Sequence, residues 1–351
     1  MRIVALDLVR FFAALSVVLY HYISRKESTA YPLFSNVTDY GYLGVPLFFI
    51  ISGYVIALSA NNRTAIQFAV SRFVRLYPAL WAGVIFTAVI SAILTEEKYS
   101  AAQILANFTL LNEYLGFEDI DGVYWTLKAE LKFYACIFLL LAVGVFQRFK
   151  IWLSLWLGLT IMHTITGQPF FMGWFITPEY SSFFIAGIAF FLIQSTEEKT
   201  FNYFILLSSL IVSSFRVYGQ ADGFLSNPDV AERLVSVAIV WAFYFFMFFL
   251  SIGKINIKKR NIYITIGALT YPLYLIHNVA GKALIDKYSS VVPEATMIII
   301  VTILMILASW LIHLAIEKPL STPLKDYLLS VFNRNKPLTK QSSRPPSSEA
   351  D

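Results

Sequence analysis

Apolar runs recur along the whole of this 351-residue chain, and short charged or Pro- and Gly-rich breaks separate them. Most of the runs are long enough, as helices, to cross a hydrocarbon layer of about 30 Å. Hydrophobic residues make up 58% of the sequence and charged residues only 14%, too little charge to cover the surface of a soluble domain of this length. The sequence therefore predicts an all-α fold, in the form of a polytopic bundle of membrane-spanning helices.

The charges between the runs predict how the bundle is oriented. Lys and Arg are concentrated after the even-numbered runs, so the positive-inside rule places both termini in the cytoplasm. The net charge of +5 is explained by this orientation, and we expect no nucleic-acid partner. We expect an integral-membrane domain at 1–332 and a disordered cytoplasmic tail at 333–351. About ten spans are expected, at 5–24, 41–60, 76–95, 125–146, 151–166, 179–194, 201–216, 233–252, 262–283 and 295–316.

The first run, "LDLVRFFAALSVVLYHY" (6–22), carries three ionisable residues, Asp7, Arg10 and His21. On a helix, Arg10 and His21 lie within roughly 20° of one angular position, and Asp7 lies one turn before Arg10. Ionisable side chains that face lipid are costly, so this face is predicted to point into the bundle. A separation of roughly 16 Å along the axis places Arg10 near the cytoplasm and His21 in the outer half. The alternative is an Asp7–Arg10 pair that only stabilises packing, with His21 as an interior histidine.

Two further arginines, Arg72 and Arg75, open the third run in "SRFVRLYPALW" (71–81). At this spacing both guanidinium groups lie on one side of the entering helix, and Arg10 is expected at the same depth. Because guanidinium groups bind phosphates bidentately, the cluster is predicted to hold phosphate groups. The alternative is that these arginines only anchor the helix by the positive-inside rule.

A carboxylate, Glu130, lies about five residues into the fourth run, "YWTLKAELKFYACIFLL" (124–140), and Tyr134 follows one turn deeper on the same face. The expected depth of Glu130 matches that of His21. A carboxylate beside an imidazole orients the ring and raises its basicity, as a general base requires. We therefore predict a His21–Glu130 pair, with a surface pair between Glu130 and a neighbouring lysine as the alternative.

Four other residues have two interpretations each. His277, in the outer half of the ninth run, is expected either to bind an acceptor hydroxyl or to be a hydrogen-bonding residue of the core. Ser52 and Gly53 either allow close helix packing or leave room for a narrow acyl chain. Glu317, at the cytoplasmic end of the last run, is expected to pair with an arginine or to act in catalysis.

In their order along the chain, these stretches resemble the motifs of the acyltransferase-3 family. Its members are bacterial integral-membrane O-acyltransferases that act on polysaccharides, lipopolysaccharide, Nod factors and related glycans. The resemblance implies a ten-span domain that takes an acyl group, usually acetyl, from cytoplasmic acyl-CoA and passes it to a glycan hydroxyl at the outer side. It covers nearly the whole chain and rests on the Arg10…His21 pattern, "FFIISGY" (48–54), "RFVRLYP" (72–78) and "YWTLKAELKFY" (124–134).

The chain departs from the family in the fourth run, where the family commonly has two adjacent glutamates. Here "WTLKAELKFY" keeps only Glu130, and Lys128 and Lys132 replace small or polar residues. This departure weighs against a role for two carboxylates. The residues that the resemblance implies to be functional are Arg10, His21, Ser52, Gly53, Arg72 and Arg75.

These observations give one hypothesis, a membrane-bound O-acyltransferase of the bacterial cytoplasmic (inner) membrane. His21 and Glu130 are its expected catalytic residues, acyl-CoA (usually acetyl-CoA) its co-substrate, and no metal is expected. The expected partners are a glycan or lipid-linked sugar acceptor and the lipid bilayer. The alternative is a transporter or flippase for a lipid-linked glycan, which would move its substrate without consuming acyl-CoA. The expected donor-binding residues are Arg10, Arg72 and Arg75, and the expected substrate-binding residues are Ser52, Gly53, Tyr134 and His277.

Overall fold

The computed structural model describes residues 3–24, 36–167 and 177–334, and within these ranges the chain forms helices and no β-strand. The predicted all-α fold is therefore confirmed. The first half contains α1 (Val4–Leu19), α3 (Gly44–Ala60), α4 (Ala65–Leu94), α5 (Ala101–Asn107), α6 (Tyr124–Ala142) and α7 (Phe149–Thr166). The second half contains α9 (Pro178–Ser195), α10 (Lys199–Gln220), α11 (Val230–Ser251), α12 (Asn261–Ile276), α13 (Val279–Tyr288), α14 (Glu294–Ile312) and α15 (Lys318–Arg334). Short helical turns are η1 (Tyr20–Ser24), η2 (Asp39–Leu43), η3 (Asn112–Leu115), η4 (Ala221–Gly223) and η5 (His313–Glu317).

Each predicted span coincides with at least one of these helices. By length and composition, 6 helical segments are able to cross a membrane, and α12 is a shorter apolar helix. A multi-pass bundle of membrane helices is thus supported, whereas the count of about ten spans and the cytoplasmic side of both termini stay predictions. The segments are Val4–Ser24, Asn36–Ala60, Ala65–Leu94, Lys199–Gly223, Val230–Ser251 and Glu294–Phe332.

The third span begins earlier than predicted, because a capping box starts α4 ahead of the apolar run. The Thr64 side chain accepts a hydrogen bond from the Gln67 N–H, and the Gln67 side chain accepts one from the Thr64 N–H. Pro78 lies inside the helix rather than at its start. Arg72 and Arg75 are therefore part of one continuous helix, which fixes their directions relative to the rest of the bundle.

The ninth predicted span consists of two helices, which meet at His277 and Asn278. The Asp121 carboxylate accepts hydrogen bonds from the Asn278 side chain at 2.8 Å and from the Val279 N–H at 2.9 Å. It thereby satisfies a backbone donor in the first turn of α13 that has no partner within the helix. The break is thus stabilised by a loop that precedes α6.

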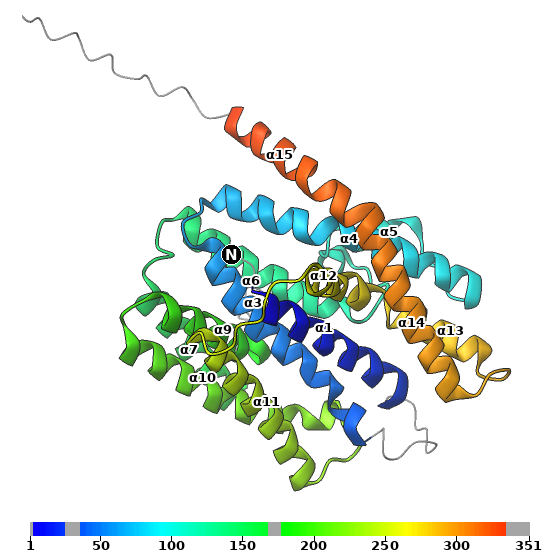
Figure 1. Ribbon diagram of the computed structural model, residues 1–351, viewed down its shortest axis with the longest axis horizontal. Helices are drawn as coiled ribbons and strands as arrows, with labels where there is room; N and C mark the ends of the chain where they lie inside the picture. Colours follow the sequence, from blue (N-terminus) through cyan, green and yellow to red (C-terminus); the bar gives the residue numbers. More distant parts are fainter. Residues whose placement is uncertain (1–2, 25–35, 168–176, 335–351) are drawn as a thin grey trace, which may run out of the picture.

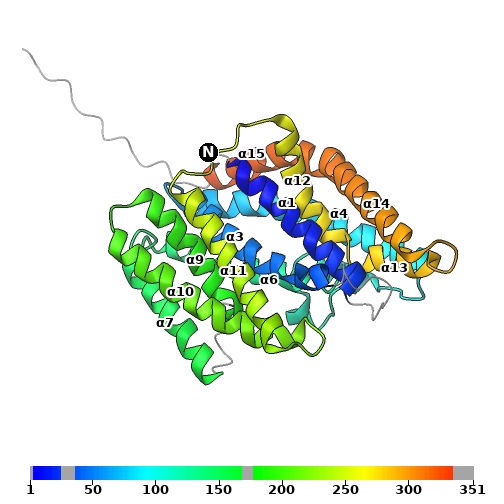
Figure 2. The ribbon, with the colours of Figure 1, turned by 60° about the horizontal axis from the view of Figure 1, so that its bottom comes forward.

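The helices form two groups on either side of a central set (Figures 1 and 2). One group contains α7, α9, α10 and α11, the other contains α4, α12, α13, α14 and α15, and α1, α3 and α6 lie between them. α15 packs along α4 and then extends beyond the bundle. It ends at Arg334, so it includes the first residues of the predicted tail at 333–351, and the rest of that segment lies outside the described residues.

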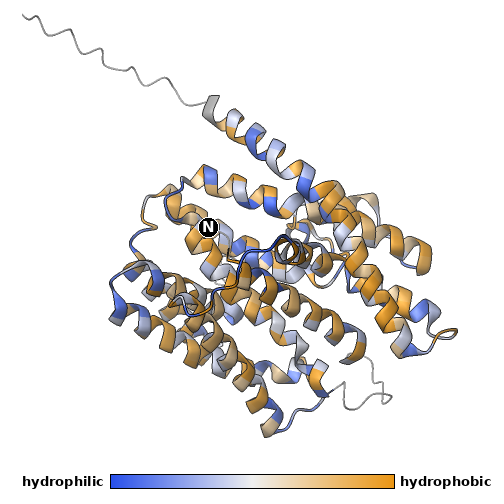
Figure 3. Cartoon of the chain, viewed as in Figure 1, coloured by the Kyte–Doolittle hydropathy of each residue, from blue (hydrophilic) through white to orange (hydrophobic). Residues whose placement is uncertain are grey.

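The outer faces of the helices are largely apolar (Figure 3). Large exposed side chains include Phe12, Ile165 and Phe215, each of them more than half exposed. Such a surface is unfavourable in water, and a lipid environment accommodates it. The fold therefore agrees with the membrane location that the sequence predicts.

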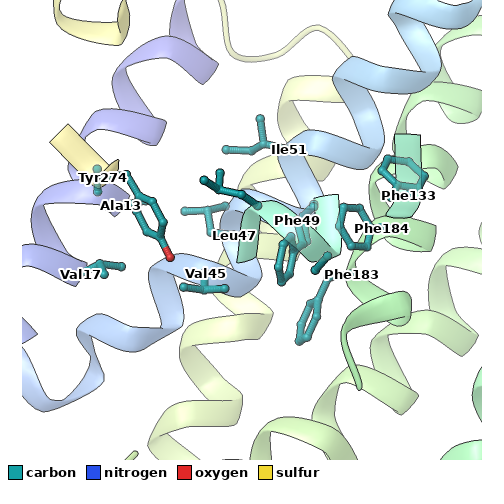
Figure 4. Packing of buried hydrophobic residues seen from close by; sticks show 14 of the residues in the cluster. Ala13, Val17, Val45, Leu47, Phe49, Ile51, Phe133, Phe183, Phe184 and Tyr274 are labelled. Carbon is teal, nitrogen blue, oxygen red and sulfur yellow. The ribbon is translucent and has the colours of Figure 1, made fainter. Parts of the chain in front are cut away.

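α3 and α9 approach each other closely in the core, through Gly53 and Gly187. A Cβ atom on Gly53 would lie 2.2 Å from the carbonyl oxygen of Phe184, and one on Gly187 would lie 2.0 Å from that of Ile50. Only glycine permits this approach. Next to it, the rings of Phe49 and Phe184 lie 4.6 Å apart (Figure 4). This contact joins the central helices firmly to the α7–α11 group.

Candidate active site

A cavity of about 690 Å³ lies among α1, α3, α4, α6, α12 and α15. We name it the inner cavity, after the predicted orientation. The residues of the predicted site that line it come from four helices, which the fold therefore brings together. They are Arg10, Ser52, Arg72, Arg75, Glu130 and Tyr134.

Glu130 faces the inner cavity and connects three helices. Its carboxylate accepts a hydrogen bond from the Ser52 hydroxyl at 2.5 Å. Its charge attracts Arg10, and Tyr134 is hydrogen-bonded to it as well. Glu130 thus joins α6 to α3 and balances a cation of α1.

The structure places Glu130 and His21 in different cavities, so their predicted pairing is not supported. The reason is the depth of α6. The preceding loop folds back over the start of this helix, so Lys128 is only 6% exposed and forms ion pairs with Glu113 and Asp119 of the loop. Glu130 therefore lies deeper than its position in the sequence indicates, level with the arginines. Its neighbour Lys128 binds the loop acids rather than forming the alternative surface pair.

Arg75 is already balanced by a carboxylate. It forms an ion pair with the buried Glu317, which also contacts His313 Nδ1 at 2.8 Å. The predicted arginine partner of Glu317 is therefore confirmed. Arg72 differs, because its guanidinium group lies over two aromatic rings, each with its centroid 5.9 Å away.

A smaller cavity of about 190 Å³ contains His21, and we name it the outer cavity. None of the described residues that line it is Asp, Glu, Lys or Arg. An uncharged, aromatic cavity favours a neutral ligand with flat apolar faces over an anion. Its aromatic lining residues, besides His21, are Tyr20, Tyr42, Trp125, Tyr180, Phe224 and Tyr274.

His277 is fully buried next to His21, with 5.3 Å between the ring centroids. Its Nδ1 lies 2.8 Å from the carbonyl oxygen of Tyr274. A carbonyl oxygen only accepts hydrogen bonds, so Nδ1 carries the proton and Nε2 is an acceptor. Within the described part of the chain, Nε2 has no hydrogen-bond partner. His277 therefore offers an unused acceptor close to His21.

Tyr274 and Val45 line both cavities, so they form the wall between them. Figure 4 shows Tyr274 with Val45 and Val17 close by. The Tyr274 hydroxyl is hydrogen-bonded to Thr126 at 3.0 Å, and its ring packs edge-on against Phe48 with centroids 5.7 Å apart. The sequence contains 20 tyrosines, and nothing in their spacing distinguishes this one. One aromatic ring and one valine side chain thus lie between the cavity with the arginines and the cavity with His21.

Gly53 lines neither cavity in the described part of the chain. It lies against α9, as the packing interpretation of the Ser52–Gly53 pair predicts. Ser52, one residue earlier, faces the inner cavity and Glu130. The two residues therefore occupy different environments, although they are adjacent in the sequence.

Asp121 is a fully buried carboxylate next to the outer cavity that the sequence analysis does not single out. Its hydrogen-bond partner Asn278 lines that cavity. Burial raises the pKa of Asp121 from 3.8 to about 6, and hydrogen bonds from Asn278, Val279 and Val123 oppose this shift. A single aspartate in a loop has no sequence signal that would reveal its burial.

The two cavities have different chemical capacities. Guanidinium groups in the inner cavity are able to bind anions, and an imidazole in the outer cavity is able to take a proton from a hydroxyl group. Within residues 3–24, 36–167 and 177–334, no group of three or more His, Cys, Asp or Glu side chains is arranged to hold a metal ion.

The chain is similar to known proteins in two respects. Residues 3–314 match a family model described as an acyltransferase domain. Nodulation protein 10 of Rhizobium leguminosarum bv. viciae is 30% identical over 128 residues, which cover 30% of this chain and 34% of that protein. The chain therefore matches about a third of the length of this relative. No solved structure matches the chain.

Proposed function

This chain belongs to the acyltransferase-3 family and is an acyltransferase, and we propose that it transfers an acyl group, in the simplest case acetyl, from cytoplasmic acyl-CoA to a hydroxyl group of a cell-surface or lipid-linked glycan. We further propose that it acts in the cytoplasmic (inner) membrane of a bacterium. The single observation that carries this proposal is the pair of cavities, one rich in arginine and one aromatic and uncharged, on either side of a thin wall.

The inner cavity is the proposed donor site. Arg10, Arg72 and Arg75 line it together, and phosphate groups are the anions that guanidinium groups bind best. The volume of about 690 Å³ lies within the range of sites for cofactor-sized ligands. Ser52 and Tyr134 line the same cavity and are the proposed contacts of the arm that carries the acyl thioester.

The outer cavity is the proposed acceptor site. Sugar rings are neutral, and their apolar C–H faces pack well on aromatic side chains such as those that surround His21. His277 does not line this cavity in the described part of the chain, but its unused acceptor Nε2 belongs to a ring that lies next to that of His21. The cavity is small, so it accommodates only part of a large glycan at one time.

The proposed reaction is a direct acyl transfer. His21 acts as general base and removes the proton of the acceptor hydroxyl while the oxygen attacks the thioester carbonyl. The C–S bond breaks, and the protonated imidazole returns the proton to the thiolate of coenzyme A. His277, whose ring packs next to that of His21, holds the His21 ring in position. Glu130 acts in the inner cavity through Ser52 and Arg10, and Gly53 acts indirectly by keeping α3 against α9.

The proposal is tested with the purified protein in proteoliposomes, acetyl-CoA labelled in the acetyl group, and glycan extracted from the source cells. Label and one acetyl mass are expected on the glycan with the wild type and are expected to be lost with His21→Ala. His163→Ala is the matched control, because His163 lies in α7 and lines neither cavity. Transfer by His21→Ala at the wild-type rate, at equal protein concentration, would contradict the proposal.

A further inference from the structure

Arg63 and Arg72 converge on the same two hydroxyl groups beside the inner cavity. Ser59 Oγ accepts hydrogen bonds from Arg63 Nη1 and Arg72 Nη2, both at 3.2 Å. Ser71 Oγ accepts from Arg63 Nη1 and Arg72 Nε, also at 3.2 Å. Two positive charges are therefore held next to each other through two neutral groups.

No carboxylate within the described ranges forms an ion pair with Arg63 or Arg72, in contrast to Arg75, which is paired with Glu317. Arg63 and Arg75 are like charges that repel Arg72, whereas Glu130 attracts it. Like charges held this closely are unfavourable unless an anion lies between them. The arrangement therefore favours a negatively charged ligand.

The two serine hydroxyl groups differ in whether their own proton is already used in a hydrogen bond. Ser71 donates its proton to the carbonyl oxygen of Phe68 at 2.9 Å, so it acts on the arginines only as an acceptor. Ser59 accepts from both arginines and donates to no residue in the described part of the chain. Each guanidinium group also has five N–H donors, not all of them used here. An anion at this point would meet donors from two guanidinium groups and one hydroxyl.

The last helix adds a net positive charge to the same cavity, because Lys318 and Lys325 line it together with Asp326. Two lysines and two hydroxyl residues of α15 line the cavity at the spacing i, i+3, i+4 and i+7, which is one face of a helix. This face was part of neither the predicted site nor the predicted spans. The four residues are Lys318, Ser321, Thr322 and Lys325.

We propose that Arg63, Arg72 and Ser59 bind a phosphate monoester at the mouth of the inner cavity. A phosphate monoester carries a charge of about −1.5 to −2 near pH 7 and has three acceptor oxygens, which matches two guanidinium groups and a hydroxyl. The inference rests on the proposed donor, acyl-CoA, whose 3′-phosphate is such a monoester. A phospholipid with a monoester headgroup, phosphatidic acid, has the same chemistry and is the second possible source.

The position of the site along α3 agrees with a long donor. Ser59 lies near the end of α3, and Val45, in the wall between the cavities, lies near its start. The fourteen residues between these positions correspond to about 21 Å of helix. A phosphate bound at Ser59 and a thioester at the wall would thus lie at opposite ends of α3. Coenzyme A has its phosphates and its thiol at opposite ends of an extended arm.

The experiment measures binding to the full chain in nanodiscs of neutral phosphatidylcholine, by calorimetry with coenzyme A and with dephospho-coenzyme A, which lacks the 3′-phosphate. The wild type is expected to bind coenzyme A about tenfold more tightly, because charge-assisted hydrogen bonds to the monoester are lost in the shorter ligand. Arg63→Gln and Ser59→Ala are expected to reduce this preference, and Arg63→Lys to keep part of it. Arg148→Gln, an exposed arginine that lines neither cavity, is the matched control.

A second arm uses nanodiscs that contain phosphatidic acid. If the monoester belongs to a lipid, phosphatidic acid binds the wild type but not Arg63→Gln, and coenzyme A and dephospho-coenzyme A bind equally. That outcome supports the phosphate site and contradicts only the proposal that acyl-CoA is the donor. The same holds if coenzyme A does not bind at all. The inference is overturned if the wild type distinguishes neither coenzyme A from dephospho-coenzyme A nor phosphatidic acid from phosphatidylcholine.

Discussion

The inner and outer cavities are neighbours, yet their linings are almost opposite in character. The inner cavity carries arginine and lysine side chains from α1, α4 and α15, whereas the described lining of the outer cavity has no charged side chain other than a histidine when protonated. Charge inside a membrane protein is costly and is retained where function needs it. The contrast indicates that one cavity recognises its ligand by charge and the other by shape and hydrogen bonding.

The largest effect that we expect separates donor binding from chemistry. Arg72→Gln removes a cation from the inner cavity and leaves His21 untouched, so KM for acyl-CoA is expected to rise about 100-fold, the equivalent of about 2.7 kcal/mol. The value of kcat is expected to change by less than about threefold. Steady-state kinetics in proteoliposomes measures both constants. A fall in kcat with an unchanged KM would show that the inner cavity does not serve donor binding alone.

The second prediction concerns His277, where we expect the opposite pattern: a change in kcat without a change in KM. His277→Asn removes the acceptor Nε2 beside His21, and kcat is expected to fall about tenfold or more because the reacting groups lose their orientation. KM for acyl-CoA is expected to stay as in the wild type. The control is His163→Asn, because His163 lies in α7 and lines neither cavity. If His277→Asn raises KM as Arg72→Gln does, the two cavities do not have separate roles.

The third prediction concerns the wall. Tyr274→Ala opens the two cavities to each other, so water from the acceptor side is expected to reach the thioester more often. Hydrolysis of acyl-CoA without an acceptor is expected to rise a few-fold, since removal of one aromatic side chain leaves a gap that water can enter. Tyr274→Phe keeps the ring and is the matched variant. Equal hydrolysis by Tyr274→Ala and Tyr274→Phe would mean that the ring does not separate the cavities.

The smallest expected effect is a pH dependence of the stability of the protein, which arises from Asp121 next to the outer cavity. The folded-state pKa of Asp121 is about 6, above its ordinary value of 3.8. As pH falls from 7 to 5, the folded state therefore takes up a proton before the unfolded state does, and the free energy of unfolding gains about 1 kcal/mol from this group. The difference in Tm between wild type and Asp121→Asn should change by a few degrees over this range. A difference in Tm that stays constant between pH 7 and pH 5 would contradict the raised pKa of Asp121.

The inner cavity was largely predictable because helical periodicity is a local property. Arg10 on the first helix, and Arg72 and Arg75 on the third, were expected at one depth from spacing and charge alone, and they line one cavity. Ser52, for which the sequence allowed either helix packing or room for an acyl chain, lines the same cavity. A polar residue in a membrane helix has few directions in which to point, and the bundle interior is the favourable one.

The outer half could not be predicted to the same degree, because it depends on contacts between distant segments. Lys128 appeared in the sequence only as a departure from the small or polar residues of the family. Nothing indicated that Glu113 and Asp119 would fold back onto it. Because this loop covers the start of α6, Glu130 lies at the same depth in the bundle as the arginines. His21 therefore lies beside His277 and not beside Glu130. Aromatic residues are 17% of the chain, so the few that form the cavity wall could not be distinguished from the many that face lipid.

The glycine contact between α3 and α9 also has a consequence for biosynthesis. Gly187 follows Gly53 by about 130 residues, so at a synthesis rate of roughly 5–20 residues per second α3 waits roughly 7–27 s for its partner. During that interval the small-residue face of α3 is open to lipid or to an insertion chaperone. A bulky residue at either glycine would act at this step, so the protein would be degraded before any kinetic defect could be measured.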